Sequence, residues 1–322
     1  MEHTTSADGT TIAFDRLGSG PPVILVCGGS VDRMSLAGLA ELLAKELTVL
    51  NFDRRGRGDS GDTPPYDEDR EIEDIDAVAE AAGGSAFLFG SSSGAALAMD
   101  AAARRDSITK VAMWEPPFLP EGAPRPPADT EQTFHDLVAA GRREDAAEFF
   151  MRDVVRLPPE FVEGAKQSPF WAPTVALAHT LEYDARIMGD YSIPTDRAAA
   201  VKVPAIVVAG GADFAWMPET AQTIADAMPD GRMARLEGQG HNVDLGARAR
   251  ARRVLHRLSL HARTGVSGGT RSGVRPPRRP LAGPAPEAAG TVPAAPRRPR
   301  TSTSRRPARR RGRSARSAGS SC

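Results

Sequence analysis

A Gly-Ser-Ser-Ser-Gly run at residues 90–94 separates two segments with different secondary-structure preferences. The apolar residues 86–89 before it are typical of a buried strand, and the alanine-rich residues 95–103 after it favour a helix. A strand that turns sharply into a helix strains its central residue, Ser92, and leaves no room for side chains at Gly90 and Gly94. The pattern predicts a Ser92 hydroxyl that projects above a sheet at a helix N-terminus, where developing negative charge is stabilised.

Strands and helices alternate along most of the chain, as expected when parallel strands are joined by helices. The apolar run 23–27 is typical of a central strand covered on both faces, whereas residues 119–199 favour helices without strands. The sequence predicts an α/β fold, with a mostly parallel central sheet flanked by helices and an inserted helical lid. The expected strands are 12–14, 23–27, 48–52, 86–90, 108–114, 205–209 and 231–236, and the expected core helices are 36–47, 69–82, 95–103, 217–228 and a closing helix near 254–258.

Composition and charge change near residue 260. The first 244 residues hold 21 basic and 40 acidic residues, whereas the chain after Asp244 holds 20 arginines and a single acid, Glu287. Residues 261–322 lack the apolar side chains needed to offset the entropy of ordering a chain. We therefore expect a core from residues 1–118 and 200–260, a lid from 119–199 and a disordered tail from 261–322. Without aromatic residues among its arginines, the tail predicts only weak, nonspecific binding of nucleic acid.

Other features of the sequence bear on the cellular location of the protein and on its partners. The N-terminus has no basic region followed by an apolar run, and no apolar stretch approaches the roughly 18 residues of a membrane span. Two cysteines, Cys27 and Cys322, cannot build a disulfide framework. These features favour a cytoplasmic protein without a membrane partner. We expect no cofactor and no metal, and no feature of the sequence fixes the oligomeric state.

A nucleophilic serine requires a histidine base and an acid that orients it. Among the six histidines, His241 directly follows a predicted strand, in a glycine-rich loop. Two acids also follow strands: Asp213, in Gly-Gly-Ala-Asp after strand 205–209, and Glu115, after strand 108–114. Open α/β sheets place their sites at the carboxyl ends of their strands. We expect Ser92, His241 and Asp213 to form a catalytic triad, with Glu115 as the alternative acid.

Together these motifs resemble those of the α/β-hydrolase superfamily over about residues 8–260. The resemblance rests on the 90–94 run, on Phe-Asp-Arg-Arg-Gly-Arg-Gly-Asp-Ser at 52–60, on the Gly-x-x-Asp that ends at Asp213, and on Gly240-His241. The chain order serine, acid, histidine is the order of that superfamily. The 52–60 motif resembles a tight turn after the fourth strand, with a structural role near the pocket.

The resemblance also implies an oxyanion hole, in which two backbone N–H groups stabilise a tetrahedral intermediate. The first donor is the N–H of Ser93, after the nucleophile, and the second is the N–H of Gly29 in the loop after strand 23–27. Many relatives carry His-Gly where this chain has Cys27-Gly28, so the usual histidine hydrogen bond behind this loop is absent.

The implied activity is hydrolysis of an ester, lactone or thioester of a small acyl compound through an acyl-enzyme. A serine nucleophile separates the chain from the haloalkane dehalogenases and epoxide hydrolases of this fold, which use aspartate. Haloperoxidase-like perhydrolysis and carbon–carbon bond hydrolysis are open to the same triad. Two non-enzymatic alternatives are a ligand-binding protein with a vestigial triad and a carrier domain for the arginine-rich tail. Truncation after Leu260 distinguishes the carrier-domain alternative from an enzyme, because an enzyme retains its activity without the tail.

Overall fold

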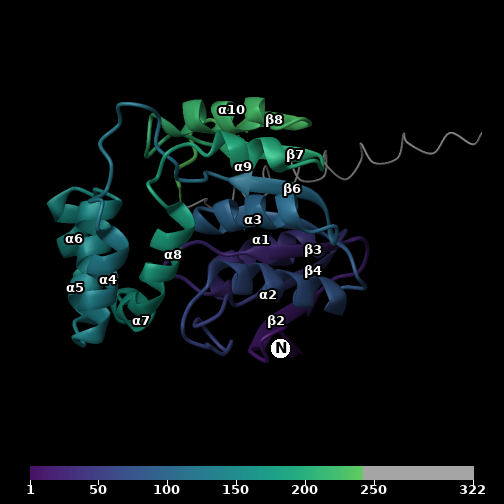
Figure 1. The fold of residues 1–322 in the computed structure, drawn as a ribbon, viewed down its shortest axis with the longest axis horizontal. Helices are drawn as coiled ribbons and strands as arrows, with labels where there is room; N and C mark the ends of the chain where they lie inside the picture. The colour runs from purple at the N-terminus through teal and green to yellow at the C-terminus, as the bar shows by residue number, and fades with distance from the viewer. Residues whose placement is uncertain (242–322) are drawn as a thin grey trace, which may run out of the picture. The chain divides into compact units, whose positions relative to one another are not determined.

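The computed structural model describes residues 1–241; the predicted closing helix and tail lie outside these residues. Eight strands form one sheet in the order β1-β2-β4-β3-β5-β6-β7-β8 (Figure 1). β1, β2 and β4 pair antiparallel, and all pairs from β4 to β8 are parallel. The predicted α/β fold with a mostly parallel sheet is thereby confirmed. The strands are β1 (Glu2–Thr5), β2 (Thr11–Leu17), β3 (Pro22–Val26), β4 (Thr48–Phe52), β5 (Ala86–Ser91), β6 (Ile108–Trp114), β7 (Ala205–Ala209) and β8 (Gly231–Arg235).

Apolar side chains cover both faces of the sheet. Successive side chains of a strand point to opposite faces, so a strand that is apolar at every residue contributes to both. In β3, Ile24 and Val26 join one buried cluster, and Val23 and Leu25 join another. Helices α2, α3 and α10 contribute to the first cluster and α1 to the second. Each fully buried aliphatic side chain contributes about 1.5–3 kcal/mol. These elements are η1 (Arg33–Leu36), α1 (Ala37–Leu43), α2 (Glu68–Ala81), α3 (Ser93–Arg104) and α10 (Met217–Ala227).

The chain leaves the sheet after β6 and returns to it at β7. Figure 1 shows α4 to α7 grouped at one side of the sheet, with α8 between them and α3. Part of this segment has an apolar core of its own, which contains Phe134, Ala146 and Leu181. We call the helices between β6 and β7 the inserted helices. They are α4 (Thr130–Ala139), α5 (Arg143–Phe149), the π-helix η2 (Phe150–Val154), α6 (Pro159–Lys166), α7 (Trp171–Ala176), η3 (Ala178–Thr180), α8 (Leu181–Met188) and α9 (Thr195–Ala200).

The parallel register aligns the carboxyl ends of three neighbouring strands. Ser91 of β5 pairs with Trp114 of β6, which pairs with Val208 of β7. The residues that follow this row therefore emerge at one edge of the sheet, where open α/β sheets bind ligands. No helix within residues 1–241 combines the length and the apolar character needed to cross a membrane.

Candidate active site

Ser92 occupies a strained turn between β5 and α3. Its φ of 56° and ψ of −128° lie in a region that side-chain-bearing residues rarely adopt. Glycines make the turn possible: a Cβ on Gly90 would lie 2.2 Å from the carbonyl oxygen of Gly94, and one on Gly94 would lie 2.3 Å from that of Cys27. The Ser92 N–H donates to the Trp114 carbonyl at 2.9 Å. The predicted strand-turn-helix arrangement around this serine is therefore present.

The imidazole of His241 contacts a buried carboxylate. Nδ1 of His241 lies 2.8 Å from Oε2 of Glu115, the residue directly after β6. The other carboxylate oxygen of Glu115 accepts from the backbone N–H groups of Gly210 (2.8 Å) and Gly211 (3.2 Å). Glu115 is only 1% exposed. Its carboxylate is thus held on both oxygens and engages the imidazole at Nδ1.

Asp213, which the sequence suggests as the acid, makes a different contact. Its Oδ2 accepts from the backbone N–H of His241 at 2.7 Å. A Cβ on Gly240 would lie 2.3 Å from that oxygen, so the exposed carboxylate packs against the loop backbone. The imidazole of His241 therefore contacts Glu115, the alternative acid, whereas Asp213 contacts the backbone of His241. Glu115 emerges from β6, directly beside the serine-bearing strand β5, whereas Asp213 lies in a turn beyond the more distant β7.

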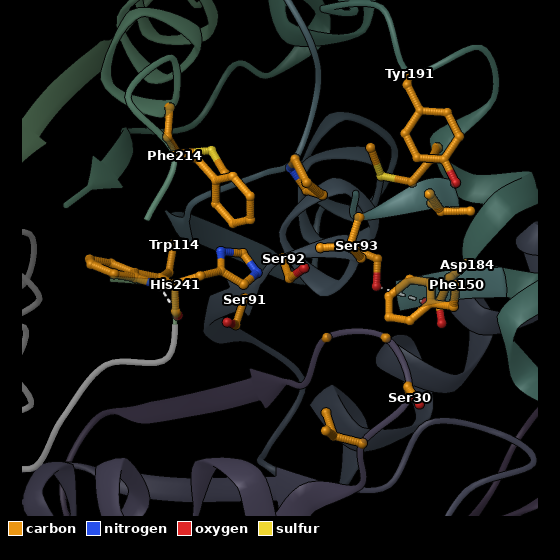
Figure 2. A pocket seen from close by; sticks show the side chains of 18 of the residues that line it. Ser30, Ser91, Ser92, Ser93, Trp114, Phe150, Asp184, Tyr191, Phe214 and His241 are labelled. Carbon is orange, nitrogen blue, oxygen red and sulfur yellow. Dashed lines mark hydrogen bonds between the residues drawn. The ribbon is translucent and has the colours of Figure 1, made fainter. Parts of the chain in front are cut away.

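The His241 imidazole is directed toward Ser92 (Figure 2). With Nδ1 engaged by Glu115, Nε2 is the nitrogen left to face the serine. The indole Nε1 of Trp114 donates to the His241 carbonyl at 2.9 Å, and the Phe214 ring meets the imidazole edge-on at 6.0 Å between centroids. Trp114 thus holds the backbone of His241, and Phe214, in the loop after β7, packs against its ring.

The two predicted oxyanion donors lie beside the serine. The loop after β3 approaches it so closely that a Cβ on Gly28 would lie 2.9 Å from Cβ of Ser92. Within residues 1–241, neither the N–H of Gly29 nor that of Ser93 donates to a carbonyl or side chain. A guanidinium nitrogen of Arg57 donates to the Gly28 carbonyl. Arg57 therefore holds the loop that follows β3.

The 52–60 motif forms a tight turn, as the resemblance implies. The buried carboxylate of Asp53 accepts from the backbone N–H groups of Arg33 and Asp59, both at 2.8 Å. Cys27, at the end of β3, is buried, and its thiol donates to the Val31 carbonyl at 3.5 Å. Burial raises the pKa of the Cys27 thiol, which suits a packing role and not a nucleophilic one.

We call the loop after β3, which carries the predicted oxyanion donor Gly29, the oxyanion loop. Beside it lies a buried cluster of four charged side chains that sequence reasoning did not identify. Arg54 donates to Glu71 of α2 through two nitrogens, each at 2.7 Å, and to Asp184 of α8 at 2.8 Å. Arg57 donates to both oxygens of Asp184, at 3.0 and 2.9 Å. Burial opposes ionisation of Asp184, but the charges of Arg57 and Arg54 and the hydrogen bond from Ser93 lower its pKa below the ordinary value. No motif marks Asp184, because its partners are about 90–130 residues distant in sequence.

A cavity of about 680 Å³ opens above Ser92. Its size suits a small organic ligand. The strand ends and their loops contribute Phe89, Trp114 and Phe214, and the inserted helices contribute Phe150 and Met151, so the wall is largely apolar (Figure 2). Among the described residues, no group of three or more His, Cys, Asp or Glu side chains is placed to hold a metal ion.

The chain belongs to the alpha/beta hydrolase family, whose model matches residues 23–257. The crystal structure of an alpha/beta hydrolase from Sphaerobacter thermophilus DSM 20745 is 48% identical, with a TM-score of 0.75, covering 80% of this chain and 100% of that chain. The family and this neighbour support hydrolase activity.

Two curated relatives match over shorter parts of their length. A segment of the polyketide synthase ThaQ of Burkholderia thailandensis is 29% identical over 255 residues, which is 71% of this chain and 11% of ThaQ. The uncharacterized hydrolase YraK of Bacillus subtilis is 33% identical over 120 residues, which is 36% of this chain and 44% of YraK. The chain thus spans less than half the length of these relatives.

Proposed function

We propose that the protein is a serine hydrolase that cleaves a carboxylic ester, lactone or thioester through an acyl-enzyme. Ser92 is the nucleophile, His241 the base and Glu115 the acid of the triad. Asp213, which the sequence favours as the acid, instead holds the loop that carries His241. The observation that carries this proposal is the 2.8 Å contact between Glu115 and His241, whose imidazole is directed toward a serine in a strained turn.

The reaction follows from the groups around Ser92. Its Oγ adds to the substrate carbonyl carbon while its proton passes to Nε2 of His241. The N–H groups of Gly29 and Ser93 receive the resulting oxyanion, and the carboxylate of Glu115 stabilises the imidazolium. Collapse of the intermediate releases the alcohol or thiol, which takes the proton from His241. Water then repeats the sequence on the acyl-enzyme and releases the acid.

The largely apolar wall of the cavity favours an acyl chain of several carbons over acetyl. Each methylene that moves from water into such a wall contributes about 0.8 kcal/mol, or roughly fourfold in kcat/KM when it is fully buried. A panel of p-nitrophenyl esters from acetate to octanoate, together with lactones and a thioester, measures this preference.

A fluorophosphonate probe tests the nucleophile directly. We expect labelling of the wild type and of Ser91→Ala, whose serine precedes the turn, and none of Ser92→Ala. Equal labelling of Ser92→Ala, or no labelling of folded wild type, contradicts the proposal. Tight binding of an acyl compound without turnover would favour the ligand-binding alternative.

A further inference from the structure

Asp184 joins the inserted helices to the two predicted oxyanion donors. It lies on α8, is 5% exposed, and accepts from the Ser93 hydroxyl at 2.7 Å (Figure 2). It also accepts from Arg57, which donates in turn to the Gly28 carbonyl. A Cβ on Gly29 would lie 3.0 Å from Oδ2 of Asp184, so the carboxylate lies directly against the oxyanion loop.

The hydrogen bond from Arg57 to Gly28 orients the neighbouring N–H. The peptide between Gly28 and Gly29 is planar, and in the usual trans form its C=O and N–H point to opposite sides. A guanidinium that holds the Gly28 carbonyl on one side therefore directs the Gly29 N–H to the other side. A hydrogen bond from a cation also polarises the peptide and strengthens its N–H as a donor.

Ser93 is held by the same carboxylate. Its N–H is the other predicted oxyanion donor, and its hydroxyl bonds to Asp184 from the first turn of α3. One carboxylate thus restrains both donors, Ser93 directly and Gly29 through Arg57. The two positive charges of Arg54 and Arg57 balance the two negative charges of Asp184 and Glu71. The cluster therefore places no net negative charge beside the developing oxyanion.

We propose that Asp184 is a positioning residue that aligns both oxyanion donors, so that the inserted helices complete the oxyanion hole when α8 packs against α2 and α3. This inference rests on the proposed serine hydrolase activity. An ion pair that only stabilised the fold would not need to contact both donors. Asp74 of α2 forms such a pair with Arg55 of the 52–60 turn, at 2.7 Å, and Asp74 is 1% exposed. Arg55 bonds only to Asp8, Arg70 and Asp74 among the described residues, so this pair is the matched control.

The test compares Asp184→Asn with Asp74→Asn. Each removes one buried negative charge and the ion pairs that this carboxylate makes with buried arginine, so each lowers the melting temperature. We expect Asp184→Asn to lower kcat by about 10- to 100-fold, as for partial loss of oxyanion donors, with KM changed less than threefold. The rate of fluorophosphonate labelling and the affinity for a trifluoromethyl ketone inhibitor fall by the same factor. Asp74→Asn keeps all of these within threefold of wild type.

A second variant separates positioning from folding. Ser93→Ala removes only the hydroxyl that bonds to Asp184 and keeps the N–H, so we expect a smaller loss of kcat, about three- to tenfold, at unchanged KM. If Asp184→Asn does not fold, Ser93→Ala alone tests the inference. A wild-type kcat in Ser93→Ala overturns it. Equal kinetics in Asp184→Asn and Asp74→Asn overturn it as well. Wild type without Ser92-dependent labelling overturns the proposed function instead.

Discussion

At the residue scale, the environment of Glu115 suits it to the acid's role. Its two oxygens meet three donors: the imidazole of His241 and the N–H groups of Gly210 and Gly211. A buried carboxylate with these partners holds the imidazole in one tautomer and stabilises its charged form. Asp213 is exposed, and within residues 1–241 its carboxylate bonds to the backbone N–H of His241.

Comparing Glu115→Gln with Asp213→Asn tests which of the two carboxylates is the acid of the triad. Glutamine presents an N–H to Nδ1 and favours the wrong tautomer, so we expect kcat/KM on a p-nitrophenyl ester to fall by about 10²–10⁴. Asparagine at 213 keeps an oxygen that accepts from the His241 N–H, so we expect a loss below tenfold. A larger loss in Asp213→Asn would return the acid's role to Asp213.

At the scale of elements, the contact of β3 with α3 determines the shape of the serine turn. Gly94, the second residue of α3, lies directly against the carbonyl of Cys27, the residue after β3, where a side chain has no room. Gly164 in α6 is exposed, and a Cβ there would meet no atom within 4 Å. The same substitution thus has opposite consequences in two helices.

Alanine at these two glycines measures that contrast. We expect Gly94→Ala to destabilise the fold by about 1–3 kcal/mol and to slow fluorophosphonate labelling, because helix and strand must separate. We expect Gly164→Ala to stabilise the fold by about 0.5–1 kcal/mol, since alanine is the better helix former, and to leave labelling unchanged. Urea unfolding checks both values. A Gly94→Ala protein as stable and as reactive as wild type contradicts the assigned contact.

At the scale of the whole molecule, a carboxylate pair links three helices and makes stability depend on pH. Glu68 of α2 and Asp100 of α3 lie together, and Arg197 of α9 donates to Asp100. Burial and the charge of Asp100 raise the pKa of Glu68 to about 7 from an ordinary 4.5. Between these values the folded chain binds more protons than the unfolded chain, so the free energy of unfolding falls as pH rises.

Removing the charge of Glu68 tests this dependence. We expect Glu68→Gln to reduce the difference in unfolding free energy between pH 5 and pH 8 by about 1–2 kcal/mol, with allowance for solvent screening. Glu73→Gln, on the same helix, is the control because its carboxylate pairs with Arg70 instead. Urea unfolding followed by tryptophan fluorescence gives both values. The same pH dependence in the two variants refutes the assignment.

The sequence alone predicted the sheet, the serine turn and the loop that carries His241. These features depend on local patterns: apolar runs of strand length, glycines around one serine, and a glycine-rich loop after a strand. β8, for example, runs from Gly231 to Arg235, close to the predicted strand 231–236. Local backbone preference and the alternation of strands with helices were sufficient for these predictions.

The tertiary structure decided which acid meets the imidazole and which groups hold the oxyanion loop. Glu115 and Asp213 both follow strands, and only the folded chain shows that Glu115 lies 2.8 Å from Nδ1 of His241. Asp184 accepts a hydrogen bond from Ser93, which is 91 residues away in the sequence, and it belongs to no recognisable motif. Such contacts arise from the packing of α8 against α2 and α3, because a buried charge requires partners from whichever elements surround it.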